Sequence, residues 1–401
     1  MRIAIYHNLP SGGAKRTLYE SARRLAGKHQ LDVFSTSSAN HEFGDLRPLA
    51  GRHEVEAFQP LPLFNSPFGR LNQAMRLLDL FRIRAVQKKI AQKIDQGSYD
   101  VLLVEHCRFE KSPSLLRYVR RVPSVYFCQE PLRELYEPMP PRPYIREDLG
   151  RRRLLNRFDP LPGLYYRSLR QTDRDNARAA SRVLVNSEFM RQAVDRIYSV
   201  RSLVSYHAVD HELFCPLPLS KKPFVLSVGS LTPLKGFDFL VRSLALVPDG
   251  LRPCLVIASN FENPPERDYL LDLARSSAVE LQLAGNINDR SLVELYNQAA
   301  LTLYAPIREP FGLVPLEAMA CSVPVVAVAE GGIRETVLHQ HTGLLVEREP
   351  EQFAAAVTSL LSDPSLACRL GENGRKQVLE RWTWDLATAR LEDHLAAAAG
   401  N

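Results

Sequence analysis

The segment that decides the architecture of the surrounding chain is Ile307-Arg308-Glu309-Pro310-Phe311-Gly312-Leu313-Val314-Pro315-Leu316-Glu317-Ala318-Met319-Ala320-Cys321. The apolar run Leu301–Tyr304 precedes it, Pro310 and Gly312 interrupt the backbone, and apolar residues then recur at helical spacing. The pattern predicts a buried parallel strand, a loop and a helix that begins at Leu313. Pro315 is compatible with the first turn of this helix because N–H groups there have no intrahelical partner.

Two carboxylates flank the start of the predicted helix. Glu309 lies in the loop and Glu317 on the helix. The free N–H groups and the helix dipole between them favour an anion, whereas carboxylates accept hydrogen bonds from sugar hydroxyls. This arrangement suits a ligand that is polyhydroxylated at both ends and anionic in the middle. A nucleotide sugar has that chemistry.

The string E-P-F-G-L-V-P-L-E-A-M-A, followed by P-V-V-A and G-G-I-R-E, resembles the signature of retaining glycosyltransferases of the GT4 type. The resemblance implies an α/β protein of the GT-B fold, with two Rossmann-like, doubly wound parallel-sheet domains that face a central cleft. A chain of 401 residues is long enough for two such domains. We expect residues 1–212 to bind the acceptor, residues 213–384 to bind the donor, and residues 385–401 to form a helix that returns to the first domain.

The resemblance also assigns the donor side. It places Glu317 on the ribose, Glu309 on the donor sugar and Lys235 on the diphosphate, and it implies Glu309 and Lys235 as catalytic residues. Ser230 stands where family members usually have an arginine, so Lys235 is expected to carry more of the phosphate charge. The remaining expected donor contacts are Gly12, Gly13, Phe311, Gly312, Leu313 and Val314.

The expected acceptor side follows from two strand-like runs in the first half of the chain, residues 100–106 and 122–131. Ligands in open α/β sheets bind beyond the carboxyl ends of the strands. Gln129 occupies the position at which the resembled family often has a histidine. Arg133 either binds an anionic acceptor group or pairs with Glu137 one helical turn later. The acceptor-side candidates are His106, Gln129, Glu130 and Arg133.

Charge is unevenly divided along the chain. Residues 1–200 contain 34 Lys and Arg against 21 Asp and Glu, whereas residues 201–401 contain 17 against 24. The basic half is therefore expected to face an anionic partner. A basic amphipathic helix near residues 70–94 and the run Arg151-Arg152-Arg153 fit either an anionic membrane surface or solvated charge around a packed helix. Residues 139–162 are rich in Pro and Arg and are expected to form a loop over the acceptor site.

We expect a nucleotide-sugar donor, a glycan or lipid-linked acceptor and no nucleic-acid partner. The beginning of the chain predicts a strand and not a signal peptide, which favours a cytoplasmic protein, either free or peripheral on the inner face of the membrane. No D-x-D candidate occurs in a suitable loop, so neither a metal nor another cofactor is expected. Three alternatives stay open: a nucleotide-sugar epimerase or hydrolase, a non-catalytic membrane-surface partner and, disfavoured by the missing G-x-G-x-x-G, a nicotinamide-dependent oxidoreductase.

Overall fold

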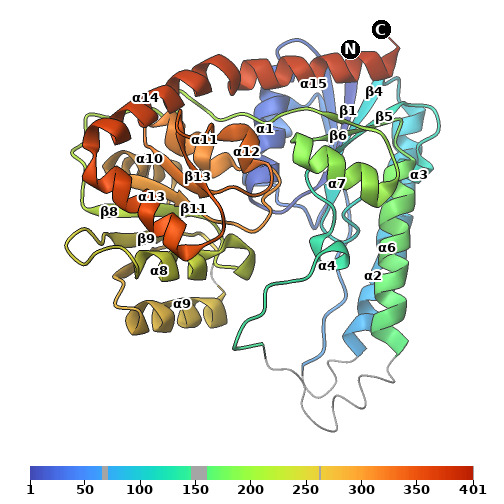
Figure 1. Cartoon of the computed structure of the whole chain (residues 1–401). Helices are drawn as coiled ribbons and strands as arrows, with labels where there is room; N and C mark the ends of the chain where they lie inside the picture. Colours follow the sequence, from blue (N-terminus) through green and yellow to red (C-terminus); the bar gives the residue numbers. More distant parts are fainter. Residues whose placement is uncertain (66–70, 146–159, 262, 401) are drawn as a thin grey trace. The chain divides into compact units, whose positions relative to one another are not determined.

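The computed structural model of the protein describes residues 1–65, 71–145, 160–261 and 263–400. The chain divides into two compact units (Figure 1). Unit 1 comprises Met1–Pro138, Glu147–Tyr206 and Ala387–Asn401, and unit 2 comprises Met139–Arg146 and His207–Leu386. Each unit contains one parallel sheet in the described part of the chain, so the two predicted Rossmann-like domains are confirmed.

The sheet of unit 1 has the strand order β3-β2-β1-β4-β5-β6-β7, and every described pairing is parallel. Its central strands are almost entirely buried, as expected for a sheet that helices cover on both faces. The strands are β1 Arg2–Asn8, β2 Gln30–Thr36, β3 Arg52–Glu56, β4 Val101–Cys107, β5 Ser124–Cys128, β6 Arg182–Val185 and β7 Ser202–Val204.

Helices of unit 1 pack on this sheet and on one another. The long helices α2 and α6 lie side by side (Figure 1). Helix α15 places Leu391 and Leu395 in the apolar core beside β1 and β2, which anchors the C-terminal segment to unit 1. The helical segments are α1 Gly13–Leu25, η1 Arg47–Leu49, α2 Asn72–Gln96, α3 Leu115–Tyr118, α4 Arg133–Tyr136, α6 Pro160–Arg178, α7 Glu188–Tyr198 and α15 Trp384–Ala399.

The sheet of unit 2 has the strand order β10-β9-β8-β11-β12-β13, again parallel throughout its described pairings. The strands are β8 Phe224–Val228, β9 Cys254–Ala258, β10 Leu281–Ala284, β11 Leu301–Tyr304, β12 Val325–Val328 and β13 Gly343–Val346. The helical segments are η3 Pro233–Lys235, α8 Phe237–Leu244, α9 Pro264–Ser276, α10 Asp289–Gln298, α11 Leu313–Ala320, α12 Ile333–Thr336, α13 Pro350–Ser362 and α14 Pro364–Arg381. The predicted strand before the central motif and the predicted helix start at Leu313 are confirmed.

The basic helix expected near residues 70–94 is α2, and several of its charges have partners within unit 1. Lys89 and Lys93 pair with carboxylates of β3, and Arg84 pairs with the buried Glu110. The charge of α2 is thus partly used to hold the helix on its own domain. Residues 146–159, which include the predicted Arg151-Arg152-Arg153 run and much of the expected loop over the acceptor site, lie outside the described residues.

Candidate functional site

In unit 2 the polypeptide leaves the buried strand β11 and reaches α11 through a short loop. Gly312 precedes the helix with φ 97°, a backbone conformation that side chains disfavour. No side chain caps α11, and its first turn contains no acidic residue. Uncapped N–H groups at a helix start form a natural anion site, because they have no intrahelical acceptor.

Lys235 and Glu309 form an ion pair at this edge. The Lys235 Nζ donates to both Glu309 carboxylate oxygens, at 3.1 and 3.0 Å. Both side chains are partly exposed, at 24% and 19%, so an incoming ligand can reach them. The methylene groups of Lys235 lie against Gly229, where an added Cβ would be 3.3 Å from its Cγ and Cδ. The structure therefore brings together the two residues predicted to be catalytic.

Gly331 and Gly332 hold the loop that carries Glu309. A Cβ at Gly331 would lie 2.3 Å from the Glu309 carbonyl oxygen, and one at Gly332 would lie 2.3 Å from the Pro310 carbonyl oxygen. The Gly332 N–H also donates to the Glu309 carbonyl at 2.9 Å. The two glycines of the G-G-I-R-E segment are needed because the backbones approach too closely for any side chain.

Glu317 is oriented by a second contact. Its Oε2 accepts from the Tyr296 hydroxyl at 2.8 Å, and Tyr296 is fully buried. Burial, followed by the neighbouring Glu317, raises the pKa of Tyr296 well above its usual range, so the phenol stays protonated and donates. Glu317 itself is half-buried on α11. The Tyr296 hydroxyl thus holds the Glu317 carboxylate, which lies on the helix whose first turn forms the anion site.

The other donor-side candidates divide into buried and accessible groups. The Phe311 ring is buried against His207 and Trp382, with ring centroids 5.7 and 5.6 Å away, so its side chain packs the loop. Leu313, Val314 and Ser230 are half-buried. Burial lowers the pKa of His207 to about 3, so this imidazole is neutral at physiological pH.

In unit 1 the acceptor-side candidates follow the carboxyl ends of β4 and β5. His106 is half-buried, and burial with the nearby Lys111 lowers its pKa well below its usual range. The Gln129 amide nitrogen lies 3.3 and 3.4 Å from the two Glu105 oxygens. Glu130 pairs with Lys111 at 3.2 Å. Arg133 donates to Glu137 through two nitrogens, the local pairing that the sequence analysis left open.

Sequence reasoning missed a buried basic group at the same edge. Lys15 on α1 is 1% exposed, and its Nζ lies 3.2 Å from the Nε2 of His7 at the end of β1. The rings of His41 and His53 continue this group. Lys15 takes part in no ion pair within the described chain, and burial lowers its pKa to about 8. Glu105, 3% exposed, has a pKa raised by burial to about 8.

One signal for Lys15 was present in the sequence. Lys15, Leu18, Ala22 and Leu25 follow one another at helical spacing, so the lysine belongs to the apolar face of α1. A cation on such a face indicates a buried charge with a specific environment. Close to it, Gly12 has φ 137°, and an added Cβ would meet no atom within 4 Å. The backbone at Gly12 is therefore open at the start of α1.

Comparisons with known proteins agree with this geometry. The family described as "Glycosyltransferase Family 4" matches residues 11–213, which is half of the chain, and the family "Glycosyl transferases group 1" matches residues 212–377. The chain belongs to glycosyltransferase family 4. Its two parallel-sheet units are those of the GT-B fold.

Two curated relatives illustrate the similarity of this family 4 protein. It is 35% identical over 164 residues to an uncharacterized glycosyltransferase of Methanocaldococcus jannaschii, covering 40% of this chain and 41% of that protein. It is 34% identical over 190 residues to a GDP-mannose-dependent alpha-(1-6)-phosphatidylinositol monomannoside mannosyltransferase of Mycobacterium tuberculosis, covering 44% and 48%. The chain spans about half the length of the curated relatives it matches.

A solved structure extends the likeness in fold. Sucrose-phosphate synthase from Thermosynechococcus elongatus superposes with a TM-score of 0.75 at 20% identity, covering 99% of this chain and 100% of that one. It supports the GT-B fold of the family 4 protein over its whole length.

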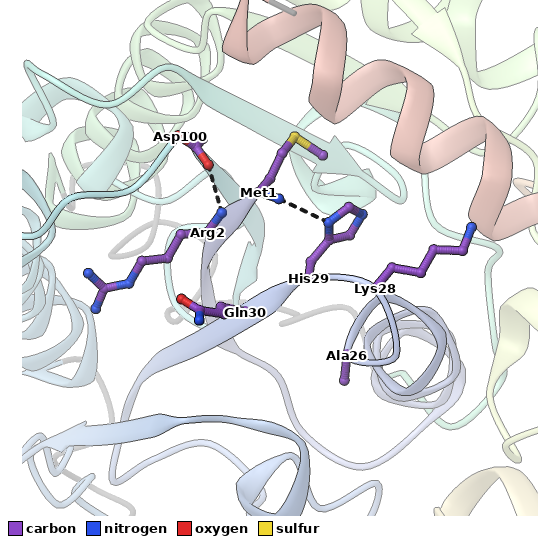
Figure 2. A pocket seen from close by; sticks show the side chains of 7 residues that line it. All are labelled: Met1, Arg2, Ala26, Lys28, His29, Gln30 and Asp100. Atoms are coloured by element: carbon purple, nitrogen blue, oxygen red, sulfur yellow. Dashed lines mark hydrogen bonds between the residues drawn. The ribbon is translucent and has the colours of Figure 1, made fainter.

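A further pocket lies at the opposite edge of the unit 1 sheet, where β1 and β2 begin (Figure 2). The Met1 amine contacts His29, and the Arg2 N–H donates to Asp100. Because ligands of parallel sheets bind beyond the carboxyl ends of the strands, this pocket is not the candidate substrate site. The other lining residues are Ala26, Lys28 and Gln30.

No described helix is long and apolar enough to cross a membrane. No group of three or more His, Cys, Asp or Glu in the described ranges is arranged to hold a metal ion.

Proposed function

We propose that this family 4 glycosyltransferase transfers a hexose-type sugar, with retention of configuration and without a metal, from a nucleotide-diphosphate sugar to a hydroxyl of a glycan or lipid-linked acceptor. The observation that carries the proposal is the pair Lys235–Glu309 beside the uncapped start of α11, with Glu317 on the same helix. Glu317 accepts from the ribose diol and Glu309 from the sugar hydroxyls, while Lys235 and the helix N–H groups face the diphosphate. Such preorganised donors stabilise the negative charge that develops on the leaving group.

The ion pair between Lys235 and Glu309 changes partners when the donor binds in this proposal. Without donor, Glu309 neutralises Lys235. A diphosphate brings more negative charge than one carboxylate, so it competes for the ammonium and releases Glu309 to accept from the sugar. No residue acts as covalent nucleophile in this proposal. The acceptor proton passes to an oxygen of the leaving phosphate.

We further propose an acceptor that carries an anionic group. Lys15 supports this, since its buried ammonium lies 3.2 Å from the neutral imidazole of His7 and takes part in no ion pair among the described residues, whereas buried cations are usually paired. The relative from M. tuberculosis is named for a phosphatidylinositol-linked acceptor. That name and the basic character of residues 1–200 both favour an anionic or lipid-linked acceptor in cell-surface glycan biosynthesis.

Peripheral membrane contact at the cytoplasmic face is a finer proposal for unit 1. Leu78 and Phe81 on α2 and Leu164 on α6 are large apolar side chains that are about half exposed. They lie on the neighbouring helices that also carry arginines, the combination that favours an anionic lipid surface. Sedimentation with vesicles of phosphatidylglycerol and of phosphatidylcholine tests it: we expect binding to the anionic vesicles only, and binding to neither contradicts the proposal.

The principal test is a thermal-shift screen with UDP-, GDP- and ADP-sugars. A donor that binds the native state raises the melting temperature by mass action. We expect one nucleotide class to do so, and no shift with any of them contradicts the donor site. Incubation with that donor alone then separates the alternatives, because an epimerase or hydrolase converts it without an acceptor. A transferase converts it only slowly until an acceptor is added.

A further inference from the structure

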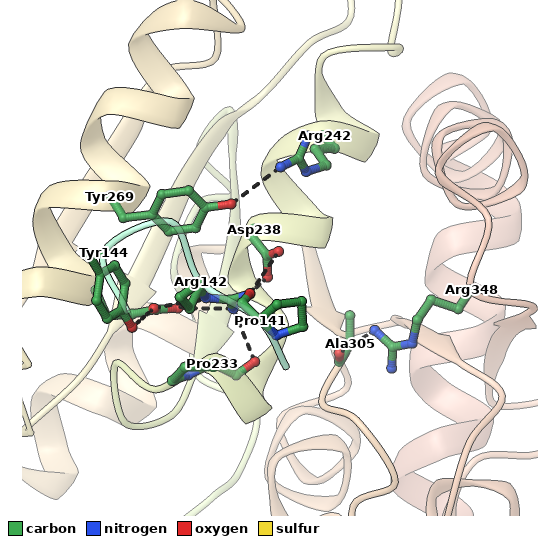
Figure 3. Close-up of polar contacts among 10 residues, drawn as sticks. Pro141, Arg142, Tyr144, Pro233, Asp238, Arg242, Tyr269, Ala305 and Arg348 are labelled. Atoms are coloured by element: carbon green, nitrogen blue, oxygen red, sulfur yellow. Dashed lines mark hydrogen bonds and ion pairs between the residues drawn. The ribbon is translucent and has the colours of Figure 1, made fainter. Parts of the chain in front are cut away.

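A short piece of chain between two stretches of unit 1 belongs to unit 2. Residues 139–145 are grouped with unit 2 by their contacts, and Arg142, the one charged residue of this piece, is 8% exposed. Its guanidinium contacts α8 and α9 (Figure 3). This segment is separate in sequence from the main stretch of unit 2, residues 207–386, and it contributes one arginine to that unit. Ordering these residues costs conformational entropy, which their contacts must offset.

Arg142 makes a dense set of contacts. Its Nε lies 3.1 and 3.0 Å from the two oxygens of Glu266, whose side chain is fully buried. Its Nη2 lies 3.0 Å from Asp238 and 3.2 Å from the carbonyl oxygen of Pro233. Because guanidinium nitrogens are fixed in one plane, these contacts set the position of Pro233 relative to α8 and α9. Lysine has a single charged nitrogen and cannot reproduce all three.

Pro233 is the first residue of the turn η3, and Lys235 is the last. The turn is held from its other side as well. A Cβ on Gly236 would lie 2.1 Å from the Ala305 carbonyl oxygen, so the end of the turn lies directly on the end of β11. Arg348 in turn donates to the Ala305 carbonyl at 3.0 Å (Figure 3) and to the Pro306 carbonyl at 2.9 Å. Arg142 therefore holds the first residue of the turn that presents Lys235, and the end of the turn packs on a segment that Arg348 holds.

We propose that Arg142 is a positioning residue for the diphosphate site: by holding the Pro233 carbonyl it fixes the turn that aims the Lys235 ammonium. This inference rests on the proposed function in one respect, the binding of a donor diphosphate by Lys235. Arg142 does not touch the ligand in this proposal. It sets where the lysine charge stands before the ligand arrives, and small displacements of a positioned group weaken its interaction strongly.

The test is a double-mutant cycle on nucleotide affinity. Isothermal titration with UDP, GDP and ADP is performed on the wild type, Arg142→Gln, Lys235→Met and the double variant. We expect Arg142→Gln to weaken binding of the preferred diphosphate by about 10- to 100-fold, the range for a misplaced contact. In the Lys235→Met background the same substitution should have almost no further effect, because its route through the lysine is gone. An equal loss in both backgrounds overturns the proposal.

Controls separate positioning from folding. Arg242→Gln on α8 removes a neighbouring arginine whose contact is the Tyr269 hydroxyl, at 3.2 Å, and should leave affinity unchanged. Arg142→Gln leaves Glu266 buried without its cation, so Arg142→Gln/Glu266→Gln provides a variant in which both charges are gone. It should recover the melting temperature and keep the weak nucleotide binding. Recovery of both, or an Arg242→Gln variant as weak as Arg142→Gln, overturns the proposal.

A structural readout keeps the inference independent of the proposed function. If the wild type binds none of the three diphosphates, the donor assignment fails, and the crystal structure of Arg142→Gln/Glu266→Gln decides the positioning role. We then expect the turn η3 to shift and the contact between Lys235 and Glu309 to be lost. An unchanged turn with that contact intact overturns the role of Arg142.

Discussion

The carboxyl edges of the two sheets differ in the partners and in the burial of their charged side chains. In unit 2, Lys235 faces the carboxylate of Glu309, and both remain partly exposed. In unit 1, Lys15 faces an imidazole and Glu105 faces the amide of Gln129, and both are almost fully buried. Burial therefore brings the pKa of Lys15 down to about 8 and that of Glu105 up to about 8. The edge of unit 2 therefore keeps a charged ion pair, whereas the edge of unit 1 contains two groups that change charge at about pH 8.

The largest effect is expected at the paired edge, from Glu317→Ala. The thermal shift given by the preferred nucleotide diphosphate should be lost, because the proposed ribose acceptor is removed. The Tyr296 hydroxyl is also left buried without this acceptor, at a cost of about 1–3 kcal/mol in the free energy of unfolding. Melting curves with and without nucleotide measure both.

Tyr296→Phe is the matched control for this substitution. It removes the hydroxyl and leaves the Glu317 carboxylate in place, so the nucleotide shift should persist. A full shift in Glu317→Ala, or an equal loss in both variants, breaks the ribose assignment.

A smaller effect is expected at the buried edge, from Glu105→Gln. Between pH 4.5, the ordinary pKa of a glutamate, and about pH 8, folded Glu105 keeps a proton that the unfolded chain releases. Its contribution to stability is therefore complete below pH 4.5 and is lost as the pH rises to about 8. Urea unfolding at pH 5, 6.5 and 8 should show this decline in the wild type and a flatter profile in Glu105→Gln.

Lys15 changes the stability with pH in the opposite direction and over a higher pH range. Its folded pKa of about 8 lies below the ordinary 10.5, so unfolded chains bind more protons between these values and stability rises with pH there. Lys15 is half titrated at about pH 8, so the comparison of Glu105→Gln with the wild type rests on pH 5 and 6.5, where the lysine stays charged in both the folded and the unfolded chain. Parallel profiles for the wild type and Glu105→Gln below pH 8 would contradict a buried, raised Glu105.

The smallest effect is expected from an exposed pair that neither edge uses. Glu392 on α15 contacts Lys28 and His29, each at 2.9 Å, and Lys28 is well exposed. Glu392→Gln should lower the free energy of unfolding by about 0.2–1 kcal/mol, as surface ion pairs do. The loss should shrink in about 1 M salt, where screening is strong. Urea unfolding at low and high salt measures it, and a salt-independent loss would argue against an electrostatic contact.

The fold was predictable because its signals are local. Apolar runs such as Leu301–Tyr304 are long enough to mark buried parallel strands, and Gly312 marks the start of α11. A recognisable motif surrounds both Lys235 and Glu309, so the sequence assigns the two residues to one donor site, but it does not predict their ion pair. The donor and acceptor roles themselves remain predictions.

Other parts of the site depend on contacts between distant residues. Arg142 and Glu266 are 124 positions apart, and nothing around either residue indicates the other. The partner of Glu317, Tyr296, lies on the preceding helix and would pass for an ordinary core residue in the sequence. In the sequence Glu105 lies at the polar end of a strand-like run. Only its three-dimensional surroundings show that burial disfavours its charged form.

The path of residues 139–145 also limits how the enzyme can be divided. A fragment that begins at residue 207 and ends at 386 contains the whole described sheet of unit 2 and omits Arg142. Glu266 and Asp238 would then both lose the guanidinium with which they pair. A chimaera that exchanges unit 2 between relatives therefore needs two inserted pieces, residues 139–145 and 207–386. Exchange of residues 207–386 alone would pair one parent's arginine with the other's carboxylates.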